Sequence, residues 1–547
     1  MEEAPQNPET IAEYDGFGFV KGYVCSHCRS PVKLDHVDGI GTKWFKCSQC
    51  GQQSWKLKTE QRKSLENALA HLQEVKRPCT LEEVAGILDS TIKRDTSNKI
   101  ITFLSMLLTY TEEDQFNVSF TAESSTGKSY IPLELVWYFP SEDVIEYSYV
   151  SPQAFYHEHG TLLPDPTDKR EVEPEKRRKI KHIDLHRKIL VFIDQPHDVL
   201  LQRLRPLLSH DRKTLVSKIT DQRKTAGLVT KTVIIEGYPT VLFCTAKFSM
   251  EDQERTRLLL LSPDTTQSKI KDAILLRIEK ESDRHAFKKL MDSDEKRTWL
   301  KDRVYEIATS NIRNVVIPEQ LRSRIADQFF AKHTSLIPRH QRDIGRVLAL
   351  IKACAMLNLW HRERVEDSII VNEDDVTSGL KLYEQVSAAN ELGLPPEAFN
   401  VLEKLKPQIP ESGVTRKEFQ ALYYQTFHKT IGKKRLDDLL NLLFSVGLLN
   451  EEPDPSDKRL KRLLLGAGVF IIAKDTTINT PQGMSNTVSL SDLVAVHWAN
   501  ELLAERECGV CGYKRVTSWQ AETTKKASIP ICDDCVRTFK TRREEAT

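Results

Sequence analysis

The sequence predicts an α/β protein with a parallel central sheet and smaller domains before and after it in the chain. Buried-strand patterns alternate with helical stretches from residue 101 to residue 280, which is the rhythm of a parallel sheet covered on both faces. In addition, eight of the 11 cysteines fall into four Cys-x-x-Cys pairs, two near each end of the chain. A length of 547 residues is enough for three or four domains of ordinary size.

Composition narrows the class of protein. Hydrophobic residues make up 39% and charged residues 29%, as in globular proteins with apolar cores. The chain has 79 Lys and Arg against 78 Asp and Glu, so any nucleic-acid surface must come from local patches. It contains no apolar run of about 18 residues, so we expect no membrane span. The acidic, polar start has no signal-peptide core, and we therefore expect a cytoplasmic protein with reduced thiols.

The cysteine pairs have the spacing of metal sites. The first two pairs are separated by 18 residues and the last two by 20. A turn within each pair can aim both sulfurs at one metal, and two such turns complete a tetrahedron. Disulfides and a redox-active pair are the alternatives, but the matched spacing and the missing secretory signal favour metal. We predict two zinc ribbons that hold two Zn²⁺ ions, one through Cys25, Cys28, Cys47 and Cys50 and the other through Cys508, Cys511, Cys532 and Cys535.

Strand runs, helical periodicity and prolines divide the rest of the chain. "KILVFID" and "TVLFCTA" have buried-strand patterns, and "VSFTAES" and "VIIEG" are shorter candidates. The segment 165–188 is charged and aperiodic, which indicates a surface insertion. After Pro395 and Pro396, three helical patterns precede a charged turn and the strand pattern "GVFIIA", an order typical of a winged helix, with Gly447 ending the third helix. The remaining Cys79, Cys244 and Cys354 are expected to be buried apolar residues.

These patterns give a linear order of domains. We predict an N-terminal zinc ribbon over residues 1–57, a helical segment over 58–100, the α/β core over 101–280, an all-helical lid over 281–392, a winged helix over 396–475, a polar linker with a helix over 476–500, and a C-terminal zinc ribbon over 501–547.

The segment "AESSTGKS" has the form of a phosphate-binding loop between a strand and a helix. Gly127 lets backbone N–H groups turn toward a phosphate, Lys128 is placed to pair with β- and γ-phosphate oxygens, and Ser129 is placed to hold Mg²⁺. A chance match is the alternative, but the strand before the loop and the helical pattern after it favour an ATP site. The predicted binding residues are Ala122, Glu123, Ser124, Ser125, Thr126, Gly127, Lys128 and Ser129, with Ala122 where the full pattern has Gly.

A second strand supports the same site. "ILVFID" ends in Asp194, 66 residues after Lys128, and a carboxylate after a buried strand suits the shell of a bound Mg²⁺. The next apolar strand, "TVLFCTA", places the polar Thr245 near its end. The sequence therefore predicts that several strand ends contribute to one nucleotide site.

These motifs resemble the AAA+ ATPases. In that resemblance Thr245 stands at the sensor-1 position, and "MEDQERTRLLLLSPD" supplies Glu254, Arg255 and Arg257 where a finger arginine reaches the ATP of a neighbouring subunit. The segments "PRHQRDIGRVLALIKACAML" and "IIVNEDDVTSGLKLYEQV" resemble the lid of minichromosome-maintenance (MCM) helicases, with Arg339 and Arg342 as sensor-2 candidates. "RLRPLLSHDRK" and the domain order are similar to the MCM-like ATPases and primase-helicases of mobile elements. The arginines could equally form ordinary packed or solvated helix faces.

The resemblance implies a homo-oligomeric ring, such as a hexamer, that hydrolyses ATP between subunits and acts on DNA. The chain departs from the family at Gln195, because most such ATPases have Glu there to orient the attacking water. Another carboxylate could serve instead, and the nearby options are Glu134, Asp198, Asp211 and Glu236.

Two basic clusters in the predicted winged helix indicate DNA contacts. Its third helix begins with Lys433, Lys434 and Arg435, and the predicted wing carries Lys458, Arg459, Lys461 and Arg462. Solvated surface is the alternative for each cluster. The "KRRK" segment (residues 176–179) and the C-terminal "RTFKTRR" are weaker candidates, because acidic neighbours dilute the first and the second lies at the chain end.

Three functions remain open at this point. The first is a DNA-stimulated ATPase motor, which the resemblance implies is a helicase. The second is an ATP-switched DNA-binding initiator, loader or regulator with little hydrolysis, which Gln195 favours. The third is a structural protein with a degenerate nucleotide site.

Overall fold

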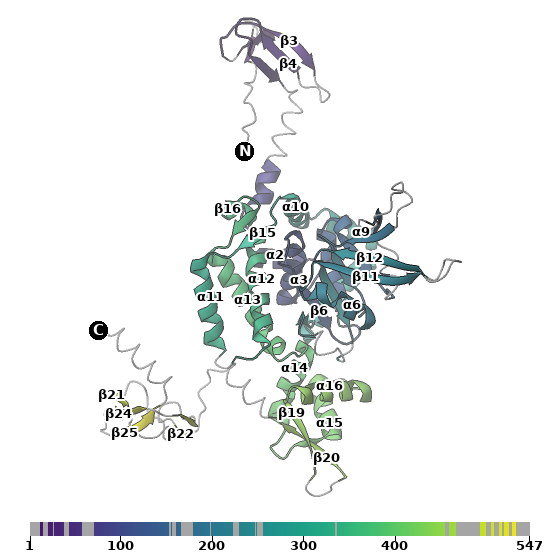
Figure 1. Cartoon of the computed structure of the whole chain (residues 1–547), viewed down its shortest axis with the longest axis vertical. Coiled ribbons are helices and arrows are strands. Elements are labelled where there is room, and N and C mark those ends of the chain that lie inside the picture. The colour runs from purple at the N-terminus through teal and green to yellow at the C-terminus, as the bar shows by residue number, and fades with distance from the viewer. Residues whose placement is uncertain are drawn as a thin grey trace. The chain divides into compact units, whose positions relative to one another are not determined.

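The computed structural model divides the chain into two units, residues 1–470 and 471–547, and each is described by itself. Figure 1 draws the described residues as helices and arrows. The structure describes residues 11–14, 20–25, 27–37, 43–56, 70–151, 155, 160–165, 179–196, 198–221, 229–246, 248, 255–333, 336–454, 459–466, 493–498, 505–507, 514–516, 519–523 and 528–531.

A five-stranded, all-parallel sheet forms the centre of the first unit and confirms the predicted α/β class. Its order is β14 (Leu258–Leu261), β6 (Asn117–Thr121), β13 (Thr240–Thr245), β10 (Ile189–Phe192) and β7 (Val144–Tyr147). From β6 the chain crosses to β7 at one edge of the sheet, and from β13 it crosses to β14 at the other edge. Right-handed crossovers in opposite directions lie on opposite faces, so a crevice opens at the carboxyl ends of β6 and β13.

Both faces of this sheet are buried, because the apolar side chains of each strand alternate between two clusters. Leu242 and Cys244 of β13 face one cluster with α3 (Thr96–Leu107), α4 (Tyr130–Leu135) and α12 (His340–Leu357). Val241 and Phe243 face the other cluster, which contains α6 (Asp198–Leu208). This two-sided burial explains the continuous apolar runs in the sequence. Cys79, Cys244 and Cys354 are all buried, as expected.

A second sheet corrects two expectations about the core. It contains β11 (Thr214–Asp221), β12 (Val229–Glu236), β9 (Lys179–Asp184) and β8 (Thr161–Pro164), in that order. The "VIIEG" strand belongs to this sheet rather than to the parallel one. Within the expected insertion 165–188, the β9 residues pair with β12 and bury Ile183 against the second cluster. Of the "KRRK" segment, only Lys179 lies within the described residues, at the start of β9.

The predicted lid is mainly helical but holds a small sheet. Its helices are α9 (Arg284–Asp292), α10 (Glu295–Thr309), α11 (Glu319–Lys332), α12 and α13 (Glu373–Glu391). The preceding helix α8 (Gln267–Ser282) lies almost wholly within the range predicted for the core. The strands β15 (Asn314–Val316), β17 (Ser368–Ile370) and β16 (Arg364–Val365) pair between them and correct the all-helical expectation. Figure 1 shows α11, α12 and α13 side by side. Before the core, α2 (Leu81–Leu88) precedes α3.

The segment after Pro395 has the expected order of helices and strands. It contains α14 (Pro396–Leu405), α15 (Arg416–Phe427) and α16 (Lys433–Ser445), with a sheet of β18 (Val414–Thr415), β20 (Lys461–Leu465) and β19 (Leu449–Pro453). Gly447 follows α16 with φ +70°, a left-handed conformation that suits glycine. The last strand comes from "KRLLL", so Lys461 and Arg462 lie in a strand rather than in the turn. "GVFIIA" and Lys458 fall outside the described residues.

Short strands make up the described parts near the two chain ends. The first cysteine module contains β1 (Ile11–Tyr14), β2 (Val20–Val24), β3 (Val32–Val37), β4 (Lys43–Cys47) and β5 (Gln53–Lys56). The second unit contains β21 (Leu493–Trp498), β22 (Glu505–Glu507), β23 (Lys514–Val516), β24 (Trp519–Thr523) and β25 (Ser528–Ile531). The strand β21 replaces the helix expected in residues 476–500. Cys508, Cys511, Cys532, Cys535 and the "RTFKTRR" tail lie outside the described residues.

The described residues also form single turns of 3₁₀ helix. These are η1 (Leu108–Tyr110), η2 (Val136–Tyr138), η3 (Ser141–Asp143), η5 (Leu359–His361) and η6 (Lys406–Gln408). Among the helices that the structure describes, none combines the length and the apolar character needed to cross a membrane.

A fully buried arginine ties α10 to the end of α12. The Arg303 guanidinium donates to the carbonyls of Leu357 (2.7 Å) and Val75 (2.6 Å). We predict that Arg303→Met lowers the free energy of unfolding by about 3 kcal/mol, because these buried carbonyls lose their donors. Denaturant titration followed by tryptophan fluorescence measures the change. Arg284→Ala is the control, since that side chain is 74% exposed; equal stability of the two variants would contradict the prediction.

Candidate functional site

The predicted phosphate loop lies between β6 and α4, at the carboxyl edge of the parallel sheet. Gly127 has φ +88° and Ser125 has φ +67°, so two residues of the loop adopt left-handed backbone. The Thr126 hydroxyl donates to the carbonyl of Glu123 (2.8 Å) and closes the turn. A Cβ built on Gly127 would meet no atom within 4 Å, which leaves open space in front of this part of the loop. The loop is therefore shaped as a concave backbone turn.

Asp194 and Thr245 reach the same edge because β10 and β13 are parallel neighbours of β6. The backbone N–H of Ala122 donates to the carbonyl of Thr245 (3.1 Å), which joins the loop to the end of β13. The Thr245 hydroxyl donates to Oε1 of Gln195 (3.0 Å). The backbone N–H of Gln195 in turn donates to Oδ1 of Asp194 (2.9 Å). One chain of hydrogen bonds thus connects four of the predicted site positions.

A cavity of about 720 Å³ opens beside the loop. Its wall contains the loop residues Ser125–Ser129, the turn residues Thr91 and Ile92, and the α8 residues Gln267 and Ile270. Cys244 lies beneath the loop and contacts the carbonyl of Lys128 through its Sγ (3.6 Å). Burial raises the pKa of the Cys244 thiol to about 12, so it stays a neutral packing residue.

The loop is also held by two residues of the segment after Pro395, the predicted winged helix. Glu123 accepts ion pairs from Lys429 (2.5 Å) and from Nε of Arg435 (2.9 Å). Arg435 further pairs with Glu397 (2.8 Å) and donates to the carbonyl of Ala246 (3.1 Å). This corrects the expectation that Arg435 contacts DNA phosphates, because its guanidinium is already engaged. Lys433 and Lys434, by contrast, are exposed.

The arginine candidates lie at the opposite edge of the sheet from the loop. Arg257 and Arg342 line one cavity of about 350 Å³ together with Asn117, which begins β6. At about 3.3 Å per residue, β6 separates this cavity from the phosphate loop by roughly 16 Å. These arginines are therefore far from the loop of their own chain. Glu254 falls outside the described residues.

The two finger candidates, Arg255 and Arg257, differ in burial, and so do the two sensor-2 candidates, Arg339 and Arg342. Arg255 is buried, which lowers its pKa, whereas Arg257 is half-buried. Burial and the charge of Arg346 lower the pKa of Arg339 to about 10, and its Nε lies 3.6 Å from Asp343. Arg342 is exposed and donates to the Thr256 hydroxyl.

Sequence reasoning missed Arg346, which anchors α12 to the start of β14. Its guanidinium donates to the carbonyls of Thr256 (2.8 Å) and Leu258 (2.7 Å) and pairs with Asp343 (2.6 Å). The helical spacing of Arg339, Arg342 and Arg346 was visible in the sequence. Only the fold shows which of these guanidinium groups is engaged in contacts that hold α12 in place.

The alternative carboxylates lie in different surroundings. Glu134 is 3.7 Å from Lys280, and Glu236 is 2.9 Å from His182 in the second sheet. Asp211 accepts a hydrogen bond from Ser209, and Asp198 is an exposed residue at the start of α6. Only Asp198 is close in sequence to Gln195.

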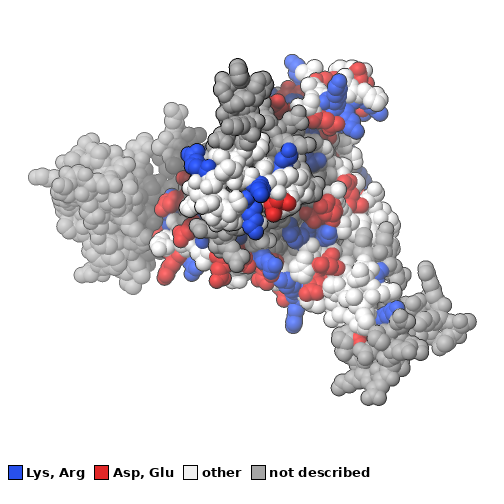
Figure 2. All heavy atoms as spheres, turned by 90° about the horizontal axis from the view of Figure 1, so that it is seen from above, with Lys and Arg blue, Asp and Glu red and all other residues white. Residues whose placement is uncertain are grey.

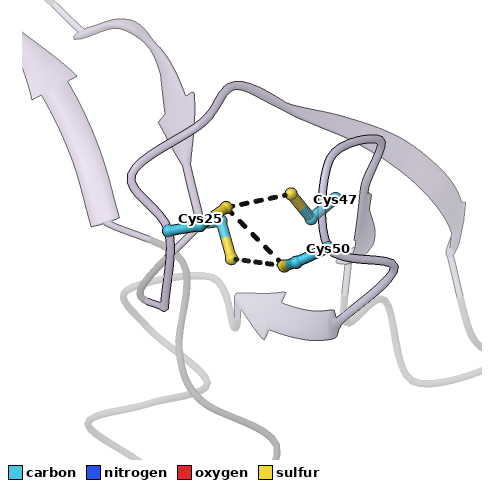
Figure 3. A group of neighbouring side chains, drawn as sticks. Cys25, Cys47 and Cys50 are labelled. Atoms are coloured by element: carbon cyan, nitrogen blue, oxygen red, sulfur yellow. Dashed lines mark hydrogen bonds between the residues drawn. The ribbon is translucent and has the colours of Figure 1, made fainter.

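The first cysteine set forms a cluster that can hold a metal ion. Figure 3 shows the side chains converging from two turns. The Sγ atoms of Cys25 and Cys50 are 3.7 Å apart, and those of Cys28 and Cys47 are 3.5 Å apart. Four thiolates at about 2.3 Å from one metal in a tetrahedron would be about 3.8 Å from each other. The turns are tight because Arg29 (φ +60°) and Gly51 (φ +72°) follow the pairs in left-handed backbone.

Charges of both signs alternate over the described surface. In Figure 2, Lys and Arg side chains are interspersed with Asp and Glu on the described part of that face. In the segment after Pro395, Lys461 pairs with Glu451 (2.7 Å) and Arg462 with Asp454 (2.5 Å). The basic clusters of the sequence are therefore partly neutralised by acidic neighbours.

No family model matches the chain, and the search of curated proteins gives no significant match.

We predict that Cys28→Ser removes one metal ion per chain. A tetrathiolate site that loses one ligand binds its metal much more weakly. Elemental analysis of the purified full-length protein measures the loss, and Cys79→Ser is the control because Cys79 is a buried cysteine outside the cluster. An unchanged metal content in Cys28→Ser would contradict the assignment.

We also predict that Arg435→Ala destabilises the winged helix by about 2–3 kcal/mol. The change leaves the buried carboxylate of Glu397 without its guanidinium partner. Limited proteolysis of the full chain should then cleave within residues 396–465 faster than in the wild type. Lys434→Ala, one residue away and exposed, should leave the cleavage rate unchanged. Equal rates in both variants would show that the contact contributes little.

Proposed function

We propose that this protein is an ATP-binding ATPase of the AAA+ type that works as an oligomer on DNA. The observation that supports it best is the meeting of three strand ends at one edge: the loop after β6, Asp194 after β10 and Thr245 of β13. A Gly-Lys-Ser loop with open space before it and a carboxylate from a nearby strand has the chemistry of a site for a nucleoside triphosphate with Mg²⁺.

Each residue then has a specific role. The backbone of residues 123–128 surrounds the β-phosphate, and Lys128 pairs with β- and γ-phosphate oxygens. Ser129 and the exposed carboxylate of Asp194 would hold Mg²⁺, which supplies charge neutralisation at the phosphates when it is bound. The cavity beside Thr91 and α8 offers room for the base and ribose.

The hydrogen bond from Thr245 assigns the orientation of the Gln195 amide. Because Oε1 accepts from the Thr245 hydroxyl, Nε2 is left as a donor that can orient a water or a phosphate oxygen. An amide cannot take a proton from that water, so we expect slow turnover unless a carboxylate such as Asp198 assists.

The position of the arginines supports an intersubunit reaction. Arg257 and Arg342 lie roughly a strand length from the loop of their own chain, so they can complete only the site of a neighbour. Arg257 is the better finger because Arg255 is buried. Arg342 is the better sensor-2 residue because Arg339 is packed beside Asp343.

Contacts with DNA rest on a smaller set of residues than the sequence suggested. Lys433 and Lys434 at the start of α16 are exposed and can contact phosphates. The cysteine cluster would hold Zn²⁺, and we propose a second such site at Cys508, Cys511, Cys532 and Cys535. Gln195 supports the alternative of an ATP-switched DNA-binding initiator or loader with little hydrolysis.

A mixing experiment tests the proposal. Lys128→Ala should lower ATP binding or hydrolysis at least tenfold, because the phosphate clamp loses its cation. Arg257→Ala should bind ATP normally but hydrolyse it poorly. Mixing the two variants should restore part of the DNA-stimulated activity, since some interfaces then carry an intact loop and an intact arginine.

The outcomes separate the candidate functions. A wild-type protein that binds DNA and ATP but shows no DNA-stimulated turnover would support the switch. A wild-type protein that neither binds nor hydrolyses ATP would refute both. Arg284→Ala serves as the matched control, because that arginine is exposed on α9.

A further inference from the structure

Three helix ends meet at a cluster of two histidines and a glutamate in the lid. His333 caps the C-terminus of α11, His340 begins α12 and Glu391 ends α13. One ligand atom from each of these side chains lies within 4.8 Å of the other two. The side chain of His333 is only 6% exposed and that of Glu391 is 18% exposed. The three groups come together only in the fold, because Glu391 lies 58 positions after His333 in the chain.

The hydrogen bonds of His333 orient a lone pair toward the glutamate. Its Nδ1 lies 2.8 Å from the carbonyl of Phe329, so the ring proton is assigned to Nδ1. Nε2 then carries a lone pair and faces Oε1 of Glu391 at 3.1 Å. Both of these buried atoms lack a hydrogen-bond partner among the described residues. Two acceptors that face each other need either a proton or a metal cation between them.

We infer that His333, His340 and Glu391 form a binding site for a divalent first-row metal ion such as Zn²⁺. Ligands at about 2.05 Å from a tetrahedral metal are about 3.3 Å apart, close to the observed separation of Nε2 and Oε1. The contact from Nδ1 of His333 to a backbone carbonyl is the arrangement that commonly orients a metal-bound imidazole. His340 offers the third nitrogen, although Nδ1 also accepts a long hydrogen bond from Ile337 (3.3 Å) that ligation through this atom would replace.

The surroundings favour a cation and give it a path. Two of the three helices, α11 and α13, present their C-termini to the cluster, where the helix dipole is negative. His340 also lines a cavity of about 910 Å³ bordered by the exposed residues Phe330 and Leu336. This cavity leaves room for a water as the fourth ligand, as in sites with three protein ligands.

A metal here would fasten the three lid helices together. It would fix the first turn of α12, which carries Arg339 and Arg342 on either side of His340. This positional consequence rests on the proposed ATPase function, but the metal site itself does not.

Metal analysis of the full-length protein tests the site. His333→Ala and Glu391→Ala should each contain one metal ion per chain fewer than the wild type, and His285→Ala on α9 should match the wild type. Combined with Cys28→Ser, either change should remove one further ion, because the two sites are separate. Circular dichroism and ATP binding report whether each variant is folded, and both should persist.

An unchanged metal content in folded His333→Ala and Glu391→Ala would overturn the inference and assign the cluster to a protonated His–Glu ion pair. Loss of metal with normal ATP binding would support it whether or not the protein hydrolyses ATP. If the wild-type protein does not bind ATP, the proposed function is refuted, but the metal result is unaffected. Glu391→Gln, which keeps the size of the side chain, should retain the metal at least tenfold more weakly.

Discussion

The parallel pairing of β6, β13 and β10 is the constraint on which the rest of the site depends. Parallel strands bring their carboxyl ends to one edge, and a sheet that is buried on both faces fixes that edge rigidly. The loop after β6 is thereby joined to Thr245 through the Ala122 N–H, and Thr245 is joined to Gln195. The same pairing sends the amino ends of β6 and β14, with Arg257 and Arg342, to the opposite edge. Under the proposed function, a loop and arginines at opposite edges of the sheet would suit assembly with copies of the same chain.

The contacts of Arg435 connect the segment after Pro395 directly to the proposed nucleotide loop. Glu123 belongs to the loop, Ala246 follows β13, and Glu397 begins α14, so one guanidinium touches three parts of the chain. Rearrangement of the loop on nucleotide binding would alter the partners of Glu123. The domain that carries Lys433 and Lys434 would then respond to the state of the site, which suits both a motor and a switch.

The sequence predicted those features that local patterns encode. The strands at Ile189–Phe192 and Thr240–Thr245 appear as apolar runs because both faces are buried, and the Cys-x-x-Cys turns of the first module follow from spacing. It could not predict the pairing of Lys429 with Glu123, which are 306 residues apart. Nor could it predict that Arg435 forms ion pairs with Glu123 and Glu397. The strand β9 escaped notice because its alternation is confined to six residues in a charged segment. The roles of ATP, DNA and ring assembly stay predictions.

Hydrogen exchange with and without Mg²⁺-ATP tests the central claim most directly, namely that three strand ends form one nucleotide site. The account predicts that amides in residues 122–131, 193–196 and 244–246 become protected together when Mg²⁺-ATP is added. It also predicts little change at the amino ends of β6 and β14 in a dilute, monomeric sample. Protection confined to another region, or no protection at saturating nucleotide, would contradict the account.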